Sequence, residues 1–253
     1  MLFRSHACDT AYHDIQHVLE VTLAMARLVG GYGHDPAKYP LLEREHFELG
    51  VVVALFHDVG YIRATDDTFA QNGAEYTLTR VSRGARFLRG YLPRIGMTNA
   101  ADVAAELIHF TGFERSPHGV NLPSLAHLLI GNLLGTADIV AQMSDRCYLE
   151  KCRDRLYPEY VAGGIARKKN ANGAEEVVFK SPDDLISKTP RFYQGAMRRL
   201  TDDLGNGLRY AERYFDGRNP YQEGIEKNMR FAERLSQAGD FSPLKRVPPD
   251  TLN

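Results

Sequence analysis

The sequence predicts a single all-α domain, and three observations lead to this prediction. In most stretches of the chain, apolar residues recur at steps of three and four, which is the period of a helix with one buried face. The one β-prone stretch, Glu176–Lys180, is short. No repeat, low-complexity tract or linker divides the 253 residues into two cores. We therefore expect residues 1–253 to form one helical bundle of about seven or eight helices.

The composition limits the class of protein more than its function. Hydrophobic residues make up 43% of the chain, charged residues 25%, and the net charge is −1. This balance gives no reason to expect binding to duplex nucleic acid or to a membrane. The three cysteines form no CxxC pair, which is typical of reduced thiols rather than of a disulfide framework. Because the N-terminal residues also lack an apolar signal region, we expect a cytoplasmic protein, and the sequence leaves open whether it forms homo-oligomers.

The first expected helix spans residues 10–29. Its apolar residues recur at helical steps, and the three glycines within residues 30–33 are expected to end it. The apolar set is Ile15, Val18, Leu19, Thr22, Met25, Ala26 and Val29. Near the start, His13 and His17 lie about one turn apart and are therefore expected on one face.

The second expected helix ends in two ionisable residues, His57 and Asp58. The apolar run Val51–Phe56 precedes them, and Gly60 follows as a stop signal. A carboxylate at the end of a buried helix is costly unless it is paired or binds a metal. Since imidazole and carboxylate are both ligands of divalent cations, this dipeptide predicts one part of a metal site.

The rest of the chain is expected to alternate between helices and loops. Helices are expected over residues 73–91, 99–110, 124–156, 190–215 and 219–237, with polar loops over 63–72 and 111–123. Between the helices expected over 124–156 and 190–215, glycines interrupt the helical pattern, and the β-prone stretch follows these glycines. Together they predict a small β-hairpin near residues 163–181.

Two imidazoles and two carboxylates are placed on or at the ends of apolar helices. They are His17, His57, Asp58 and Asp138, the last being the only acid in the apolar first half of residues 124–156. This donor set suits Mn²⁺, Fe²⁺, Mg²⁺ or Ni²⁺ in octahedral coordination completed by water, and also Zn²⁺. A lone buried histidine is more often bonded to the backbone, and a lone buried aspartate to a cap or an arginine. The four together favour a metal site, because the cost of burying each ionisable side chain would otherwise need its own explanation.

In order and spelling these residues resemble the HD-domain superfamily of metal-dependent phosphohydrolases. Tyr12-His13-Asp14, followed by His17, is similar to the YHN-x-x-H opening of cyclic-nucleotide phosphodiesterases, except that Asp14 stands where that opening has Asn. Phe56–Tyr61, which reads FHDVGY, resembles the superfamily's FHDIGY segment. Asp138 is placed as the closing aspartate of the pattern.

The resemblance implies a fold, a metal and a reaction. It covers roughly residues 8–150, which leaves about 181–237 as a C-terminal helical extension. It implies that the four residues hold one or two divalent ions, that Asp58 also orients water, and that His13 contacts phosphate and protonates the leaving oxygen. The implied reaction is hydrolysis of a phosphoester in a small nucleotide-like molecule, of the phosphodiesterase or phosphomonoesterase type. A metal-activated water would be the nucleophile.

Four further residues are candidates for a second metal ion or for binding the substrate. His109 closes the helix 99–110 and is either a ligand of a second metal ion or a histidine that contacts substrate or caps the helix. Arg63, Arg80 and Arg83 are candidate phosphate-binding residues, since guanidinium binds phosphate bidentately. For Arg80 and Arg83 the competing interpretation is a solvated helix face.

Two other functions fit the same residues. An HD-fold oxygenase with a di-iron site would keep the fold and the metal, but it needs additional histidine ligands, for which His109 is a candidate. The second alternative is a sensor domain that binds nucleotide and metal without turnover. The intact set of four ligands favours the enzyme over the sensor, because a degenerate domain usually loses one of them.

Overall fold

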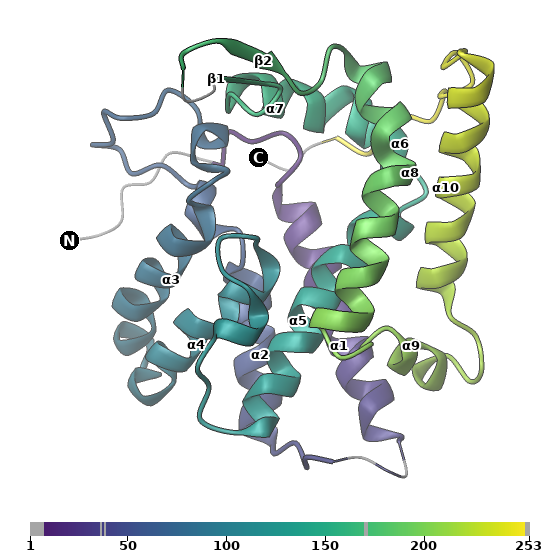
Figure 1. Ribbon diagram of the computed structural model, residues 1–253. Coiled ribbons are helices and arrows are strands. Elements are labelled where there is room, and N and C mark those ends of the chain that lie inside the picture. Colours follow the sequence, from purple (N-terminus) through teal and green to yellow (C-terminus); the bar gives the residue numbers. More distant parts are fainter. Residues whose placement is uncertain (1–7, 36, 38, 170–171, 251–253) are drawn as a thin grey trace.

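The helices pack into one bundle with a shared core. The computed structural model describes residues 8–35, 37, 39–169 and 172–250 (Figure 1). The two ends of the predicted domain, residues 1–7 and 251–253, lie outside the described residues. The predicted all-α class is confirmed, because helices make up the described elements apart from one two-stranded hairpin.

The elements are more numerous and shorter than the seven or eight helices expected. The α-helices are α1 Ile15–Gly33, α2 Arg44–Phe56, α3 Arg80–Tyr91, α4 Ala101–Leu107, α5 Leu125–Ser144, α6 Tyr148–Lys151, α7 Tyr157–Ala162, α8 Pro182–Arg198, α9 Arg209–Tyr214 and α10 Pro220–Ala238. Short 3₁₀ turns are η1 Val59–Tyr61, η2 Gly73–Tyr76, η3 Leu92–Ile95, η4 Thr98–Ala100, η5 Ile108–Thr111 and η6 Pro117–Gly119. Two π-helical turns, η7 Cys152–Leu156 and η8 Arg199–Asp203, complete the helical segments.

Helix α5 lies at the centre of the bundle. The helices α1, α2, α4 and α10 pack against it, with α4 on one side and α10 on the other (Figure 1). Among the described helices, α5 is the one long and apolar enough to cross a membrane, and 61% of its apolar window is buried inside the protein. Its apolar character on all sides is what a helix buried at the centre of a bundle requires.

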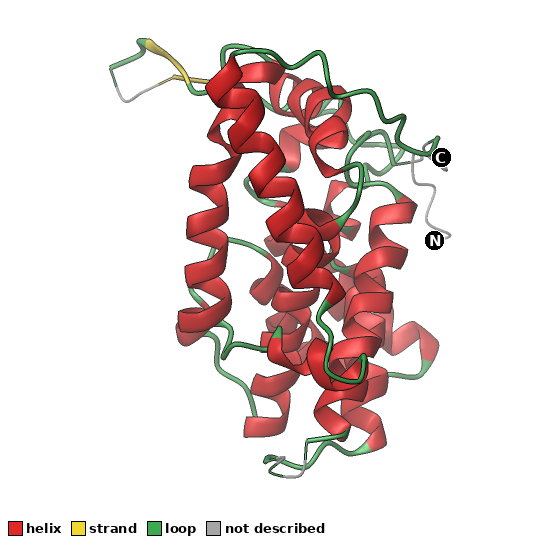
Figure 2. Ribbon diagram, turned by 90° about the vertical axis from the view of Figure 1, so that its right-hand side faces the viewer, coloured by secondary structure: helices red, strands yellow, loops and turns green. Residues whose placement is uncertain are grey.

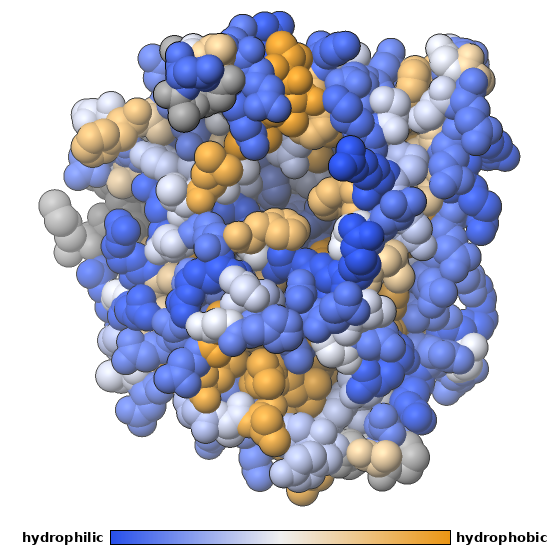
Figure 3. Space-filling model, viewed as in Figure 1, coloured by the Kyte–Doolittle hydropathy of each residue, from blue (hydrophilic) through white to orange (hydrophobic). Residues whose placement is uncertain are grey.

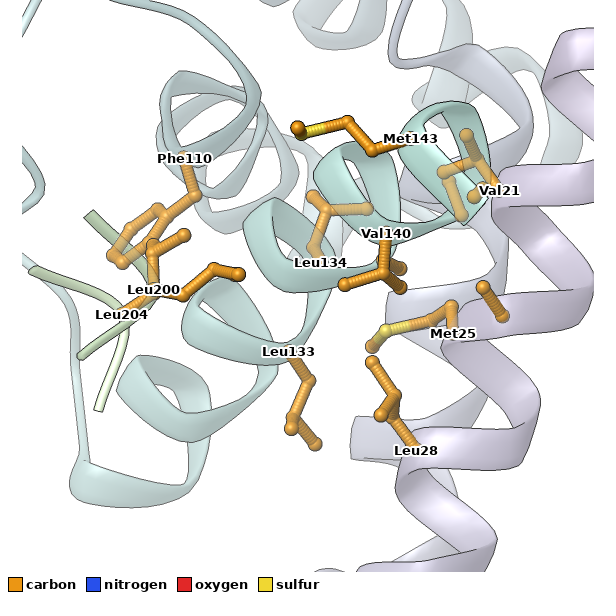
Figure 4. Packing of buried hydrophobic residues seen from close by; sticks show 14 of the residues in the cluster. Val21, Met25, Leu28, Phe110, Leu133, Leu134, Val140, Met143, Leu200 and Leu204 are labelled. Atoms are coloured by element: carbon orange, nitrogen blue, oxygen red, sulfur yellow. The ribbon is translucent and has the colours of Figure 1, made fainter. Parts of the chain in front are cut away.

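The contact between α1 and α5 fixes two of the three helices that position predicted metal ligands. Val21, Met25 and Leu28 of α1 face Leu133 and Val140 of α5, and all five side chains are buried (Figure 4). Full burial of a side chain of this size contributes about 1.5–3 kcal/mol. The relative position of α1 and α5 is therefore strongly determined by packing.

Helix α1 begins later than expected, at Ile15 rather than at residue 10. The carboxylate of Asp14 accepts a hydrogen bond from the backbone N–H of His17 at 2.9 Å and caps the helix there. The buried face is also rotated from the expected one, because Ile15 and Leu19 are exposed while His17 is buried. The rotation directs His17 toward the core.

The glycines that were expected to end α1 lie inside it, and the helix continues to Gly33. At Gly31 the helix lies directly against the backbone of α9. A Cβ atom at this position would overlap the carbonyl oxygen of Tyr210. Gly31 therefore permits a close helix–helix approach rather than terminating the helix.

The continuous helix expected over residues 124–156 is broken after α5. Asp145 leaves the helical conformation, with φ −57° and ψ 132°. The amide of Asn228 in α10 donates to the carbonyls of Met143 and Asp145 at 2.9 and 2.7 Å, so the broken end is hydrogen-bonded. After the break, α6, η7 and α7 return the chain toward the start of α1, where Glu159 contacts His13.

Two other expected helices have different bounds. The stretch 73–91 divides into η2 and α3, because the carboxylate of Glu114 binds the N–H groups of Val81 and Ser82 and caps α3 there. The helix expected over 190–215 begins at Pro182 and is interrupted after η8, where Gly205 and Asn206 have positive φ.

The hairpin is confirmed within the predicted range 163–181. Strands β1 Arg167–Lys169 and β2 Glu175–Val177 pair in antiparallel register, with Arg167 opposite Val177. The hairpin projects from one end of the bundle (Figure 2).

The C-terminal helices belong to the same core as the rest of the chain. Helix α10 packs on α5 and α8, and α8 packs on η7 and η8. Ile225 and Met229 of α10 are buried in the same cluster as Val21 of α1. The expected extension over residues 181–237 therefore completes the bundle.

Candidate metal centre

Four buried side chains from three helices converge near the middle of the bundle. His17 lies near the start of α1, His57 and Asp58 follow α2 directly, and Asp138 lies in the middle of α5. All four are at least 95% buried. The packing of α1 and α2 against α5 brings them together.

The ligand-type atoms of these residues lie close together. The Nε2 atoms of His17 and His57 are 3.2 Å apart. Oδ2 of Asp58 lies 3.3 and 3.0 Å from these two nitrogens, and Oδ1 of Asp138 lies 3.5 and 3.8 Å from them. Two donor atoms that each lie about 2.1 Å from the same ion are about 3.0 Å apart when the donor–metal–donor angle is 90°. They are about 3.4 Å apart when that angle is tetrahedral. The His17, His57 and Asp58 group could thus hold a metal ion, and Asp138 adds a fourth donor.

The hydrogen bonds of the group also fit a cation. Oδ2 of Asp58 is buried and has no hydrogen-bond partner among the described residues, a condition that is costly for a carboxylate. Nδ1 of His57 lies 2.7 Å from the carbonyl oxygen of Ala54, so Nδ1 carries the proton and the Nε2 lone pair faces the group. A cation among these atoms would bind both Oδ2 of Asp58 and the Nε2 lone pair of His57.

The electrostatics of the group favour positive charge. Burial lowers the pKa of His17, but its interactions with the carboxylates of Asp138 and Asp58 outweigh burial and raise the pKa to about 10. Burial raises the pKa of Asp58, but the charges of His57 and Arg80 outweigh it and bring the pKa well below its usual range. The two carboxylates therefore stabilise a positive charge between them, whether a proton or a metal ion supplies it.

Arg80 of α3 orients Asp58. Its Nη1 donates to Oδ1 of Asp58 at 2.9 Å, which leaves Oδ2 for the group, and its Nη2 donates to the Thr111 carbonyl at 3.0 Å. A Cβ atom at Gly60 would overlap the carbonyl oxygen of Arg80, so this glycine allows η1 to pack against the start of α3. Arg80 is thus directed inward and does not lie on a solvated helix face.

His13 is paired with a buried carboxylate. Its Nδ1 lies 2.5 Å from Oε1 of Glu159, and Oε2 of Glu159 accepts the backbone N–H of Tyr12 at 3.1 Å. The His13 ring is stacked on Tyr61, with ring centroids 4.4 Å apart, and lies edge-on to His17 at 5.7 Å. The ring is therefore fixed beside the four-residue group.

Two polar contacts of this site were not expected from the sequence. Glu159 comes 146 residues after His13, and no local pattern marks it. Gln142 donates to Oδ1 of Asp138 at 2.8 Å and accepts from the Tyr12 hydroxyl at 3.2 Å. The spacing of four residues between Asp138 and Gln142 on one helix was a signal that could have identified Gln142.

A cavity of about 320 Å³ opens beside the group. His13, Arg80, Asp138 and Arg199 line it, and three exposed apolar side chains, Leu78, Phe113 and Phe192, also line it. A second cavity of about 650 Å³, lined in part by β2, shares His13 and Phe192 with the first. On the face seen in Figure 3 the surface is hollowed near its centre, below the hairpin, and hydrophobic side chains border the hollow.

Arg63 and Arg83 lie on a different side of the group. They line a third cavity, of about 620 Å³, which Asp58 also borders. Arg63 pairs with Asp9 at 2.8 Å and donates to the Ala70 carbonyl, while Arg83 donates to the Gly60 carbonyl at 2.8 Å. Both guanidinium groups hold the loop around residues 60–76, and neither lines the cavity beside Asp138.

His109 is buried but does not join the converging donors. The group of His, Cys, Asp and Glu atoms found among the described residues comprises His17, His57 and Asp58. Nδ1 of His109 is buried and has no hydrogen-bond partner among the described residues. Burial, followed by the charge of Arg115, lowers the pKa of His109.

No family model, curated protein or solved structure matches this chain. The structure itself shows an all-α bundle with a buried His and Asp cluster that could hold a metal ion. Function is therefore inferred from the chemistry of the site.

Proposed function

We propose that this chain is a metal-dependent phosphoester hydrolase of the HD-domain type. The observation that carries the proposal is the convergence of two imidazole nitrogens and two carboxylate oxygens, with Oδ2 of Asp58 buried and without a hydrogen-bond partner among the described residues. In this proposal His17, His57, Asp58 and Asp138 hold a divalent ion, which is Mn²⁺, Fe²⁺, Mg²⁺, Ni²⁺ or Zn²⁺. Among the described residues one group of close donor atoms is found, and on this ground we propose one ion rather than two.

The residues around the group fit hydrolysis of a phosphoester. A bound divalent ion supplies Lewis acidity, which makes a water nucleophilic near neutral pH and polarises a phosphoryl oxygen. A hydroxide formed from water, whose proton goes to solvent, adds to phosphorus as the ester P–O bond breaks, and the leaving oxygen takes the Nε2 proton of His13 in its imidazolium form. Glu159 accepts a hydrogen bond from Nδ1–H of His13, which directs Nε2 away from Glu159, and Tyr61 fixes the ring plane. Arg80 keeps Asp58 in place and brings positive charge to the same cavity.

The size of the cavity supports a small-molecule substrate. About 320 Å³ lies within the range of small-ligand sites, and a net charge of −1 gives no attraction for duplex nucleic acid. The di-iron oxygenase alternative needs further histidine ligands near the group, and among the described residues His109 does not supply one. The hydrolase therefore remains the better-supported function.

Elemental analysis of the purified protein tests the proposal. We expect about one divalent ion per chain in the wild type, none in His57→Ala, and the wild-type content in His118→Ala, whose ring is exposed. The metal found is then supplied in a screen of aryl phosphomonoesters and phosphodiesters, and His57→Ala should hydrolyse none of them. Absence of any ion after incubation with each candidate metal, or full retention of the ion by His57→Ala, refutes the site.

A further inference from the structure

Arg199 is a buried cation without a carboxylate partner. It is the first residue of η8, and 8% of its surface is exposed. The ion pairs among the described residues include Arg80 with Asp58 but none with Arg199. Its Nη2 donates to the carbonyls of Phe110 and Gly112 at 2.9 and 2.6 Å, while its Nε is buried and has no hydrogen-bond partner.

Binding the two carbonyls does not account for an arginine at this position. Both bonds use one nitrogen of the guanidinium, and a hydrogen bond to a carbonyl oxygen does not require a charged donor. A buried charge is costly unless an opposite charge is close to it. Burial lowers the pKa of Arg199; the charges of Asp138 and Asp203 oppose this effect without cancelling it, and the charge of Arg80 adds to it. The positive charge is therefore maintained at a cost that its present hydrogen bonds do not explain.

Arg199 and Arg80 bind the same short stretch of backbone. Arg80 donates to the carbonyl of Thr111, which lies between the two carbonyls bound by Arg199. The two guanidinium groups come from η8 and α3, and both line the cavity that contains Asp138 and His13. This places two cations, one of them without a carboxylate partner, in the wall of the proposed active site.

The opening of this cavity is apolar. Phe113, Leu78 and Phe192 line it and are 78%, 68% and 52% exposed. The guanidinium of Arg199 lies over the Phe113 ring, 4.1 Å from its centroid. Exposed side chains of this size around one cavity are a surface that an apolar part of a ligand can cover.

We propose that Arg199, together with Arg80, binds the phosphoryl oxygens of the substrate. Guanidinium groups bind phosphate through paired N–H···O bonds, and an anion between the two would supply the charge that Arg199 lacks. The organic group of the ester then lies against Phe113 and Phe192, so the substrate class is a phosphoester with an apolar, ring-bearing group. This assignment rests on the proposed function, because that function identifies the cavity as the substrate site.

Titration calorimetry with inorganic phosphate, on metal-loaded and metal-free protein, tests the role of Arg199. Arg199→Gln keeps a polar side chain and removes the charge, whereas Arg199→Lys keeps the charge. We expect Arg199→Gln to weaken phosphate binding about tenfold or more and Arg199→Lys to stay within about threefold of the wild type. The matched control is Arg198→Gln, an exposed neighbour at the end of α8, which should bind phosphate like the wild type.

A second titration examines the apolar opening with two phosphonates that are not hydrolysed. Phenylphosphonate should bind about tenfold more tightly than methylphosphonate, and Phe113→Ser should remove most of that difference. Equal affinities of the two phosphonates for the wild-type protein refute the ring-bearing substrate class.

Three results overturn the role of Arg199. They are unchanged phosphate affinity in Arg199→Gln, equal losses in Arg199→Gln and Arg199→Lys with both variants folded by circular dichroism, and no phosphate binding by either form of the wild type. Elemental analysis of the same samples separates this outcome from failure of the proposed function. A wild-type chain that takes up no metal refutes the hydrolase, whereas a metal-loaded Arg199→Gln that binds phosphate normally refutes this inference alone.

Discussion

The pairing of His13 with Glu159 leads to a prediction that separates acid catalysis from general damage to the site. In Glu159→Gln one carboxylate oxygen becomes an NH₂ group. In the wild type, the two carboxylate oxygens of Glu159 accept one hydrogen bond each, from Nδ1 of His13 at 2.5 Å and from the backbone N–H of Tyr12 at 3.1 Å. The amide has one oxygen, so it must leave the Tyr12 N–H without an acceptor or present a donor to His13 and reverse its tautomer.

The size of the effect follows from these contacts. Glu159 is buried, and loss of a buried charge-assisted hydrogen bond costs about 1.5–3 kcal/mol. General acid catalysis is worth about 10²–10⁴ in rate. We therefore expect kcat to fall about 10²-fold, with metal content unchanged and the free energy of unfolding lowered by about 1–3 kcal/mol.

The assay compares two substrates that need the acid to different extents. Phenyl phosphate has a poor leaving group and needs a proton on the leaving oxygen, whereas 4-nitrophenyl phosphate needs it far less. We expect Glu159→Gln to lose much more activity on phenyl phosphate, and Glu176→Gln, an exposed change in β2, to lose none on either substrate. An equal loss on both substrates would refute the assignment of His13 and Glu159 as the acid pair.

Three further predictions concern the metal and the bundle. Gln142→Leu removes the donor to Asp138 and should weaken metal binding about 10–100-fold in a chelator competition; an unchanged affinity would show that this hydrogen bond does not position Asp138. Gly31→Ala should destabilise the protein in urea unfolding, because its Cβ would overlap the backbone of α9, whereas Gly33→Ala meets no atom within 4 Å and should be neutral or stabilising by about 0.5–1 kcal/mol. Equal effects of the two alanines would contradict the close approach of α1 and α9. Removing the ion with a chelator should lower the melting temperature, since free metal at 100 times its Kd stabilises by about 2.7 kcal/mol; a transition that does not move would mean that the ion does not bind the folded chain.

The local parts of the site could be predicted from the sequence. His57 and Asp58 end a buried helix within one short motif, and Asp138 is the lone acid of an apolar stretch, so periodicity and composition were enough to identify them. The start of α1 was misplaced because its cap depends on one side chain, Asp14, whose role spacing alone does not reveal.

The parts contributed by distant segments could not be predicted in this way. The end of α5 depends on Asn228, more than 80 residues later in the chain. Without that break, the course of α7 and the meeting of Glu159 with His13 could not be deduced. Arg199 was missed for the same reason, because its surroundings come from η5 and α3 rather than from its neighbours in the chain.

The π turn η7 has a consequence for how such a site can arise. Residues 148–162 form one uninterrupted helical run, and a π turn holds about one residue more than an α-helical turn. Deleting one residue from Cys152–Leu156 would rotate everything after it by about 100° relative to α6. Glu159 would then turn away from His13 although no residue of the site had changed. The extra residue of η7 thus sets the rotation of α7 that brings the Glu159 carboxylate to His13.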